Sequence, residues 1–124
     1  MPKKILIVED SEDTRAFMKY LMESYGYLAI EAADGIEALD QFKKQQPDLV
    51  LMDMSLPTVG GLTATKAIRE VDVSGAVPII AVTAFGKSYR EQAIEAGCND
   101  LLTKPLDFDV LHPLIEKYLE TEIS

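Results

Sequence analysis

The chain has 124 residues, of which 48% are hydrophobic and 27% are charged, and its formal net charge at pH 7 is −9. This composition excludes a disordered chain, and the length predicts one domain, residues 1–124, that buries about two-thirds of its unfolded surface. The negative charge, with no cluster of Lys and Arg to offset it, argues against direct nucleic-acid binding and favours a cation or a basic protein as partner.

Five short apolar runs alternate with longer segments along the chain. In chain order they are residues 5–8, 28–32, 49–52, 79–83 and a weaker run at 101–103. The first, third and fourth runs are apolar at nearly every position, which is typical of strands covered on both faces in a parallel sheet. We therefore expect five parallel strands.

Segments with apolar residues at helical spacing follow each run. Asp34 and Glu37 stand at the spacing of a capping box, which predicts the start of the second helix. Gly97 is expected to stop the fourth helix, and Pro113 predicts that the fifth is kinked or begins late. The residues that mark the helices are, in chain order, Phe17, Met18, Leu21, Met22 and Tyr25; Leu39 and Phe42; Ala64, Thr65 and Ile68; a segment from about Ser88 to Ala96; and Val110, Leu111, Leu114, Ile115, Tyr118 and Leu119.

The strict alternation of strands and helices predicts a flavodoxin-like, doubly wound α/β fold. Right-handed crossovers would place the five parallel strands in the order 2-1-3-4-5, with helices on both faces of the sheet. The sequence shows no internal repeat, and we expect a single domain with no output domain.

Polar residues stand where the apolar runs end. Glu9 and Asp10 follow the first run, Asp53 the third, Thr83 closes the fourth, and Lys104 follows the fifth. In an open parallel sheet the carboxyl ends of the strands line the ligand crevice. Residues far apart in the sequence are therefore expected to form one cluster of three carboxylates, a hydroxyl and an ammonium group.

The expected cluster has the chemistry of a magnesium-assisted phosphoryl acceptor. Three neighbouring carboxylates repel one another unless a cation lies among them, and oxygen ligands without His or Cys favour Mg²⁺. Asp53 is the carboxylate at a central strand end, and carboxylates can accept phosphoryl groups. Lys104 and Thr83 would stabilise the incoming charge. Each residue alone has an ordinary structural explanation, as a cap, a turn former or a surface charge, but the set does not.

Cys98 cannot form a disulfide within the chain, since it is the only cysteine, and its expected role is that of a small buried residue. No apolar stretch approaches the ~20 residues of a membrane span, and residues 5–8 are too short for the core of a signal peptide. We expect a cytoplasmic protein that does not insert into membranes.

The polar residues belong to a longer pattern that covers essentially the whole chain. Each piece is weakly specific, but all of them in this order and at this spacing are highly specific. The pieces are Ile5-Leu6-Ile7-Val8-Glu9-Asp10, Pro47-Asp48-Leu49-Val50-Leu51-Met52-Asp53-Met54, Leu56-Pro57, Gly61-Leu62, Pro78-Ile79-Ile80-Ala81-Val82-Thr83-Ala84, Ala96-Gly97-Cys98 and Thr103-Lys104-Pro105. This pattern resembles the receiver domain of two-component response regulators. It is similar to the single-domain regulators of chemotaxis and of bacterial cell-cycle phosphorelays.

The resemblance implies a role for each matching position. It implies Asp53 as the phosphoacceptor, Asp10 as a direct Mg²⁺ ligand, Glu9 as an acid that holds the metal through water, Ser55 as a ligand through its backbone carbonyl, Thr83 as the switch hydroxyl, Lys104 as the phosphate-binding lysine, and a cis bond before Pro105.

The resemblance also implies a signalling switch rather than a metabolic enzyme. A histidine kinase or a histidine phosphotransfer protein would donate a phosphoryl group from phosphohistidine to Asp53, with Mg²⁺ as the cofactor, and slow hydrolysis would follow. Modification is expected to draw Thr83 inward and to rearrange the face that binds a downstream protein, which the sequence does not identify.

Three positions depart from the family pattern. Leu101 replaces the usual Tyr or Phe three residues before the lysine, so the face formed by the fourth strand, fourth helix and fifth strand is expected to switch differently or less. Gly60 replaces a common Asp and should loosen the loop after Asp53. Phe85 is bulky, and we expect it to shield the acyl phosphate from water.

Three other functions fit the sequence less well. A flavodoxin-like cofactor carrier is disfavoured because acids follow the first strand, where they would repel a flavin phosphate. A Mg²⁺-dependent phosphatase needs a second acid two residues after Asp53, where Ser55 stands. A receiver-like scaffold that binds partners without phosphorylation conflicts with intact Asp10, Asp53, Thr83 and Lys104, although Leu101 keeps this alternative open.

Overall fold

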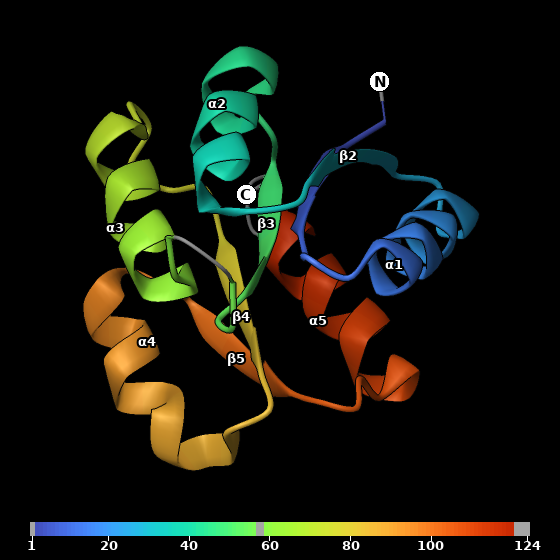
Figure 1. Cartoon of the computed structure of the whole chain (residues 1–124). Helices are drawn as coiled ribbons and strands as arrows, with labels where there is room; N and C mark the ends of the chain where they lie inside the picture. Colours follow the sequence, from blue (N-terminus) through green and yellow to red (C-terminus); the bar gives the residue numbers. More distant parts are fainter. Residues whose placement is uncertain (1, 57–58, 121–124) are drawn as a thin grey trace.

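An open parallel sheet forms the centre of the computed structural model, which describes residues 2–56 and 59–120 (Figure 1). Its five strands have the order β2-β1-β3-β4-β5, as the sequence predicted. Pro57, part of the sequence pattern, lies outside the described residues, as do the two chain ends. The strands are β1 Lys4–Val8, β2 Leu28–Ala32, β3 Leu49–Asp53, β4 Ile79–Thr83 and β5 Asp100–Thr103.

The helices cover both faces of the sheet, with α1 and α5 on one face and α2, α3 and α4 on the other (Figure 1). Asp34 accepts a hydrogen bond from the Glu37 backbone N–H at 2.8 Å, so the predicted cap of α2 is confirmed. The helices are α1 Glu12–Ser24, α2 Gly35–Gln45, α3 Gly61–Val71, α4 Arg90–Ala96 and α5 Phe108–Glu120, with a 3₁₀ turn at Gly86–Tyr89 before α4.

Two helix starts differ from the sequence-based expectation. The predicted segment from about Ser88 begins as a 3₁₀ turn and becomes α-helical only at Arg90. Helix α5 begins at Phe108 and contains Pro113, so the late start is wrong, whereas the alternative expectation of a kink stays a prediction. Asp107 allows the early start, because its carbonyl accepts from Val110 and Leu111 at 3.0 and 2.9 Å before the proline is reached.

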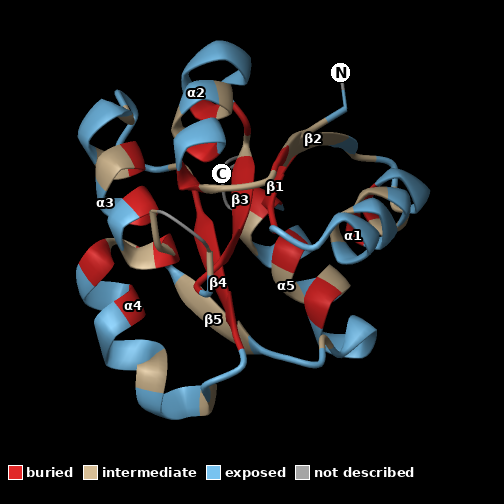
Figure 2. Cartoon of the chain, in the orientation of Figure 1, coloured by how far each residue is buried: buried red, intermediate tan, exposed pale blue. Residues whose placement is uncertain are grey.

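The three central strands are buried along nearly their whole length, as their apolar sequences predicted (Figure 2). Alternate side chains point to opposite faces of a strand, so each strand contributes to two cores. Burial of each large side chain contributes about 1.5–3 kcal/mol. On the α1/α5 face the sheet contributes Ile5, Ile7, Leu49, Leu51 and Ile80, and on the other face Leu6, Val8, Val50, Met52, Ile79 and Ala81.

Arg69 ties α3 to the start of two strands, at the sheet edge opposite the strand carboxyl ends. Its guanidinium donates to the carbonyls of Gly97 (2.9 Å) and Val77 (2.7 Å) and to the side chains of Asn99 (2.7 Å) and Asp72 (2.9 Å). Gly97 ends α4 with a φ of 118°, as predicted, and a Cβ there would lie 2.7 Å from Arg69 Cγ. This position therefore requires glycine both for its backbone and for its space.

Within residues 2–56 and 59–120, no helix combines the length and the apolar character needed to cross a membrane.

The buried carboxylate of Asp72 should make stability depend on pH. Burial would raise the pKa of Asp72, but hydrogen bonds from Ser74 and Val77 and the charge of Arg69 outweigh it, so the pKa lies below its usual value of 3.8. The stability that the carboxylate contributes is therefore present above pH ~4 and is lost as the pH falls through the lowered pKa. We expect Asp72→Asn to lower the free energy of unfolding by about 1–3 kcal/mol at pH 7, measured by urea denaturation, and by less at pH 3.

Asp40→Asn is the matched control, because Asp40 pairs with Lys44 on the exposed surface of α2. Its effect should stay below about 1 kcal/mol at both pH values. If Asp72→Asn lowered the free energy of unfolding as much at pH 3 as at pH 7, the stabilisation would not come from the ionised Asp72 carboxylate.

Candidate functional site

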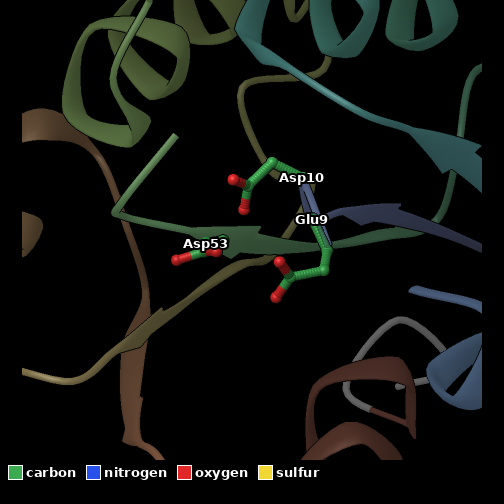
Figure 3. Close-up of side chains that lie close together, drawn as sticks. All are labelled: Glu9, Asp10 and Asp53. Atoms are coloured by element: carbon green, nitrogen blue, oxygen red, sulfur yellow. The ribbon is translucent and has the colours of Figure 1, made fainter. Parts of the chain in front are cut away.

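Three carboxylates that are distant in the sequence meet at the carboxyl ends of β1 and β3. Glu9 and Asp10 directly follow β1, and Asp53 is the last residue of β3 (Figure 3). One oxygen from each side chain lies within 4.8 Å of the others. Glu9 and Asp53 are almost fully buried, whereas Asp10 is exposed, so the cluster opens to solvent on one side. The convergence predicted from the sequence is therefore observed.

The pairing of the strands explains this convergence. Val8 pairs with Met52 in the parallel register of β1 and β3, so the residues that follow each of them emerge at the same edge of the sheet. Helix α3 also approaches this edge closely, since a Cβ on Gly61 would lie 2.5 Å from the Asp53 carbonyl oxygen. Only glycine permits that approach, and Gly61 is thus part of the architecture of the site.

Lys104 is the cation of the cluster. Its Nζ lies 3.2 Å from Asp53 Oδ2 and 3.5 Å from Glu9 Oε1. Its backbone N–H donates to the carbonyl of Thr83 at 2.8 Å, which fixes the start of the β5–α5 connection beside β4. The peptide bond from Lys104 to Pro105 is cis, as the resemblance implied. Burial alone would lower the pKa of Lys104, but the charges of Asp53 and Glu9 raise it above its usual value.

Glu9 experiences the surplus negative charge of the site. Burial raises the pKa of Glu9, and the Asp53 charge and the contact with Asp10 raise it further. A hydrogen bond from the Ser11 backbone N–H at 2.9 Å and the charge of Lys104 act in the opposite direction without cancelling the rise. Three carboxylates thus outnumber the single ammonium, and a second cation would relieve their repulsion.

The donor set fits Mg²⁺. All three side chains offer oxygen, no His or Cys is among them, and the exposed Asp10 leaves one side open for water. Ser55 holds the neighbouring carboxylate in place, because its backbone N–H donates to Asp53 Oδ1 at 2.9 Å. The ligand role expected for the Ser55 carbonyl stays a prediction.

Thr83 ends β4, the strand next to β3, and is fully buried. Its hydroxyl accepts a hydrogen bond from the Phe85 backbone N–H at 3.0 Å, which fixes the first turn of the chain after β4. The structure therefore places Thr83 at the same sheet edge as Asp53. The switching movement expected of this hydroxyl stays a prediction.

The three departures from the family pattern lie around the cluster rather than in it. Phe85 is 63% exposed, and its ring packs on Tyr89 with the ring centres 5.6 Å apart. Leu101 is partly buried against the core beneath α3 and α4. Gly60 caps α3 with an ordinary φ of −67°, and a Cβ there would meet no atom within 4 Å, so neither backbone nor space requires glycine.

Arg15, which no sequence pattern singled out, lies beside Glu9 and Asp10, the two residues after β1 that we call the acidic turn. Its Nη1 donates to the Glu9 carbonyl at 2.9 Å, and its Nε pairs with Glu31 Oε1 at 3.3 Å. A weak signal was present, because Arg15 stands one helical turn after Ser11, the residue whose side chain caps α1. Its partner Glu31 is on β2, and no sequence pattern links the two.

An apolar pocket of about 300 Å³ adjoins the cluster. Phe17 on α1 and Phe108 on α5 stand close together there, with ring centres 5.5 Å apart, and both are partly exposed. Glu9 and Lys104 also line this pocket, which therefore connects the charged cluster with an apolar surface.

Comparison with known proteins agrees with this geometry. Residues 5–116 match the family described as the response regulator receiver domain. The polar-differentiation response regulator DivK of Brucella anthropi is 40% identical over 120 residues, which cover 96% of this chain and 98% of that protein.

Two solved structures share the fold over nearly their whole length. The receiver domain of the sensor histidine kinase PA1611 from Pseudomonas aeruginosa, with a magnesium ion coordinated in its active-site cleft, is 35% identical with a TM-score of 0.88 and covers 97% of this chain and 99% of its own. The chemotaxis protein CheY4 of Vibrio cholerae is 27% identical with a TM-score of 0.89 and covers 96% of this chain and 100% of its own.

Magnesium binding should stabilise the folded chain. Because the three carboxylates meet only in the folded state, Mg²⁺ should raise the thermal midpoint of unfolding, by roughly 3–5 °C for each kcal/mol of binding linkage. Differential scanning fluorimetry in EDTA and in excess MgCl₂ measures this shift. Asp10→Asn should abolish most of it.

The matched control is Asp13→Asn, the same chemical change at an exposed position on α1 outside the cluster. This variant should keep the wild-type shift. Equal shifts in Asp10→Asn and wild type would mean that Mg²⁺ binds elsewhere.

Proposed function

Because the chain belongs to the family of response regulator receiver domains, we propose that Asp53 receives the phosphoryl group by which it is switched. Receiver domains of this family are phosphorylation-controlled switches of two-component systems. The supporting observation is the environment of Asp53. It is 2% exposed, ends a central strand, contacts Lys104 at 3.2 Å and shares the carboxylate cluster with Glu9 and Asp10.

The residues around Asp53 suit an in-line transfer. A carboxylate oxygen of Asp53 forms the new P–O bond as the P–N bond of phosphohistidine breaks, and the histidine nitrogen leaves with the bonding electron pair. The ammonium of Lys104, already beside Asp53, pairs with the phosphoryl oxygens. The cluster of Glu9, Asp10 and Asp53 would hold Mg²⁺, which would supply positive charge to offset the negative charge of the transferred group. Asp10, Asp53 and the Ser55 carbonyl are the proposed direct ligands, and Glu9 the proposed ligand through water.

The proposed donor is a protein, a histidine kinase or a histidine phosphotransfer protein. The apolar pocket between α1 and α5 supports this, because exposed Phe17 and Phe108 beside Lys104 offer an area that a protein surface can cover. A small phosphorylated metabolite would need only the polar cluster. The downstream target is proposed to be a protein as well, bound when Thr83 and the face of β4, α4 and β5 rearrange.

We place this switch in the cytoplasm. The support is cysteine usage, since the chain has a single cysteine, Cys98, and does not depend on a disulfide within the chain.

Phosphorylation at Asp53 can be measured directly by intact-mass spectrometry. Wild-type protein incubated with acetyl phosphate should gain one phosphoryl group when Mg²⁺ is present and little or none in EDTA. Asp53→Asn removes the acceptor oxygen and should gain none in either condition.

Asp40→Asn, which removes an exposed carboxylate on α2, should be modified like wild type. A phosphoryl group on the Asp53→Asn protein would show that a residue other than Asp53 is the acceptor. Wild type that stays unmodified by acetyl phosphate in the presence of Mg²⁺ would favour the scaffold that works without phosphorylation.

Phe85 is proposed to slow loss of the phosphoryl group by excluding water. In the structure its ring packs on Tyr89 and is largely exposed, so shielding requires the ring to turn towards Asp53 after modification. The Phe85→Ala variant should therefore lose the phosphoryl group several-fold faster than wild type. Intact-mass spectrometry at successive times after removal of the donor measures this rate.

Tyr20→Ala serves as control, because Tyr20 is an exposed aromatic residue on α1. Its phosphoryl lifetime should equal that of wild type. A Phe85→Ala variant that loses the phosphoryl group no faster than wild type rejects the shielding role.

A further inference from the structure

Arg15 makes two contacts that together span the acidic turn. Its side chain, 17% exposed, runs from α1 back to β1, where Nη1 donates to the Glu9 carbonyl at 2.9 Å. Its Nε pairs with Glu31 on β2 at 3.3 Å. Lys19, one turn further along α1, pairs with the other Glu31 oxygen at 3.6 Å and makes no such contact with the acidic turn among the interactions of the described residues.

The carbonyl that Arg15 holds belongs to the peptide unit between Glu9 and Asp10. Its orientation sets the direction in which both acidic side chains leave the backbone, because the two residues share that rigid plane. On the other side, the Glu9 backbone N–H donates to the Ala32 carbonyl at 3.1 Å, directly after Glu31 in β2. The backbone of Glu9 is thus held on both sides. Its N–H is bound by Ala32 of β2, and its carbonyl is bound by Arg15, whose guanidinium also contacts Glu31 of β2.

We infer that Arg15 is a positioning residue of the metal site, which holds the Glu9–Asp10 peptide so that both carboxylates converge with Asp53. The inference rests on the proposed binding of Mg²⁺ to this cluster. Glu31 acts one step further away, because it orients the guanidinium. Groups that orient metal ligands in this way typically change metal affinity by roughly 10- to 100-fold when they are removed.

Electrostatics alone makes the opposite prediction for Arg15. A guanidinium close to the cluster repels Mg²⁺, so removing its charge should strengthen binding if charge were all that mattered. If Arg15 positions the turn, its removal weakens binding despite the lost repulsion. The sign of the change in Kd therefore separates the two explanations.

Isothermal titration calorimetry of Mg²⁺ into the full chain measures this sign. We expect Arg15→Met to weaken binding roughly ten-fold and Glu31→Gln to weaken it less. The double variant should bind no more weakly than Arg15→Met alone, since both changes break the same chain of contacts. Arg15→Lys keeps the charge but cannot span the Glu9 carbonyl and Glu31 with one planar group, so its Kd should fall between wild type and Arg15→Met.

Lys19→Met is the matched control. It removes a positive charge that pairs with the same Glu31 but leaves the contact with the Glu9 carbonyl intact. Its Kd should equal that of wild type or be slightly tighter. Urea unfolding in EDTA, done for each variant, reports any loss of the fold separately from loss of the site.

The outcomes distinguish this inference from the proposed function. Wild type that binds no Mg²⁺ refutes the metal site itself. Wild type that binds, together with an Arg15→Met variant that binds equally or more tightly, overturns the positioning role and leaves the proposed function standing. Should Arg15→Met fail to fold, Arg15→Lys decides, because charge alone predicts a wild-type Kd for that variant.

Discussion

The mutual repulsion of three carboxylates, those of Glu9, Asp10 and Asp53, is the constraint on which the site depends. Glu9 and Asp53 are buried close to each other, although two carboxylates repel and each is better solvated in water. Lys104 compensates only part of their charge. The rigid parallel sheet forces the meeting, because β1 and β3 are held in register by their ladder and by apolar cores on both faces. The energy of the cores thus maintains a local arrangement that is unfavourable until a cation arrives.

The two edges of the sheet have different roles. Where the strands begin, Arg69 donates to two carbonyls, a carboxylate and an amide oxygen in the α3–β4 and α4–β5 connections, so its charge is paired within the protein. At the edge where the strands end, charge is left over and one side is open to solvent. The strand ends that carry the Arg69 network thus have paired charges, whereas the strand ends that carry Glu9, Asp10 and Asp53 have an excess of negative charge.

The sequence was sufficient for the fold and for the core of the candidate site, for a physical reason. Strands β1, β3 and β4 are apolar at nearly every position, so their ends, and hence Asp53 and Thr83, could be located from the sequence alone. Pro113 suggested a late start of α5, but the Asp107 carbonyl accepts from Val110 and Leu111 and the helix begins at Phe108, which the sequence pattern did not indicate. Arg15 was missed because its role depends on Glu31 of a neighbouring strand, and such pairs follow from tertiary geometry rather than from spacing along the chain.

Lys104 is shared by two carboxylates, and this sharing has a thermodynamic consequence. A phosphoryl group on Asp53 carries more negative charge than the carboxylate that it replaces, so it competes with Glu9 for the same ammonium. Glu9 would then have less compensation and would depend more strongly on the proposed divalent ion. Under the proposed function, ion binding and phosphorylation of Asp53 would therefore favour each other, with a coupling free energy that is equal in both directions. The shared lysine would in this way link the phosphorylation state of Asp53 to retention of the metal.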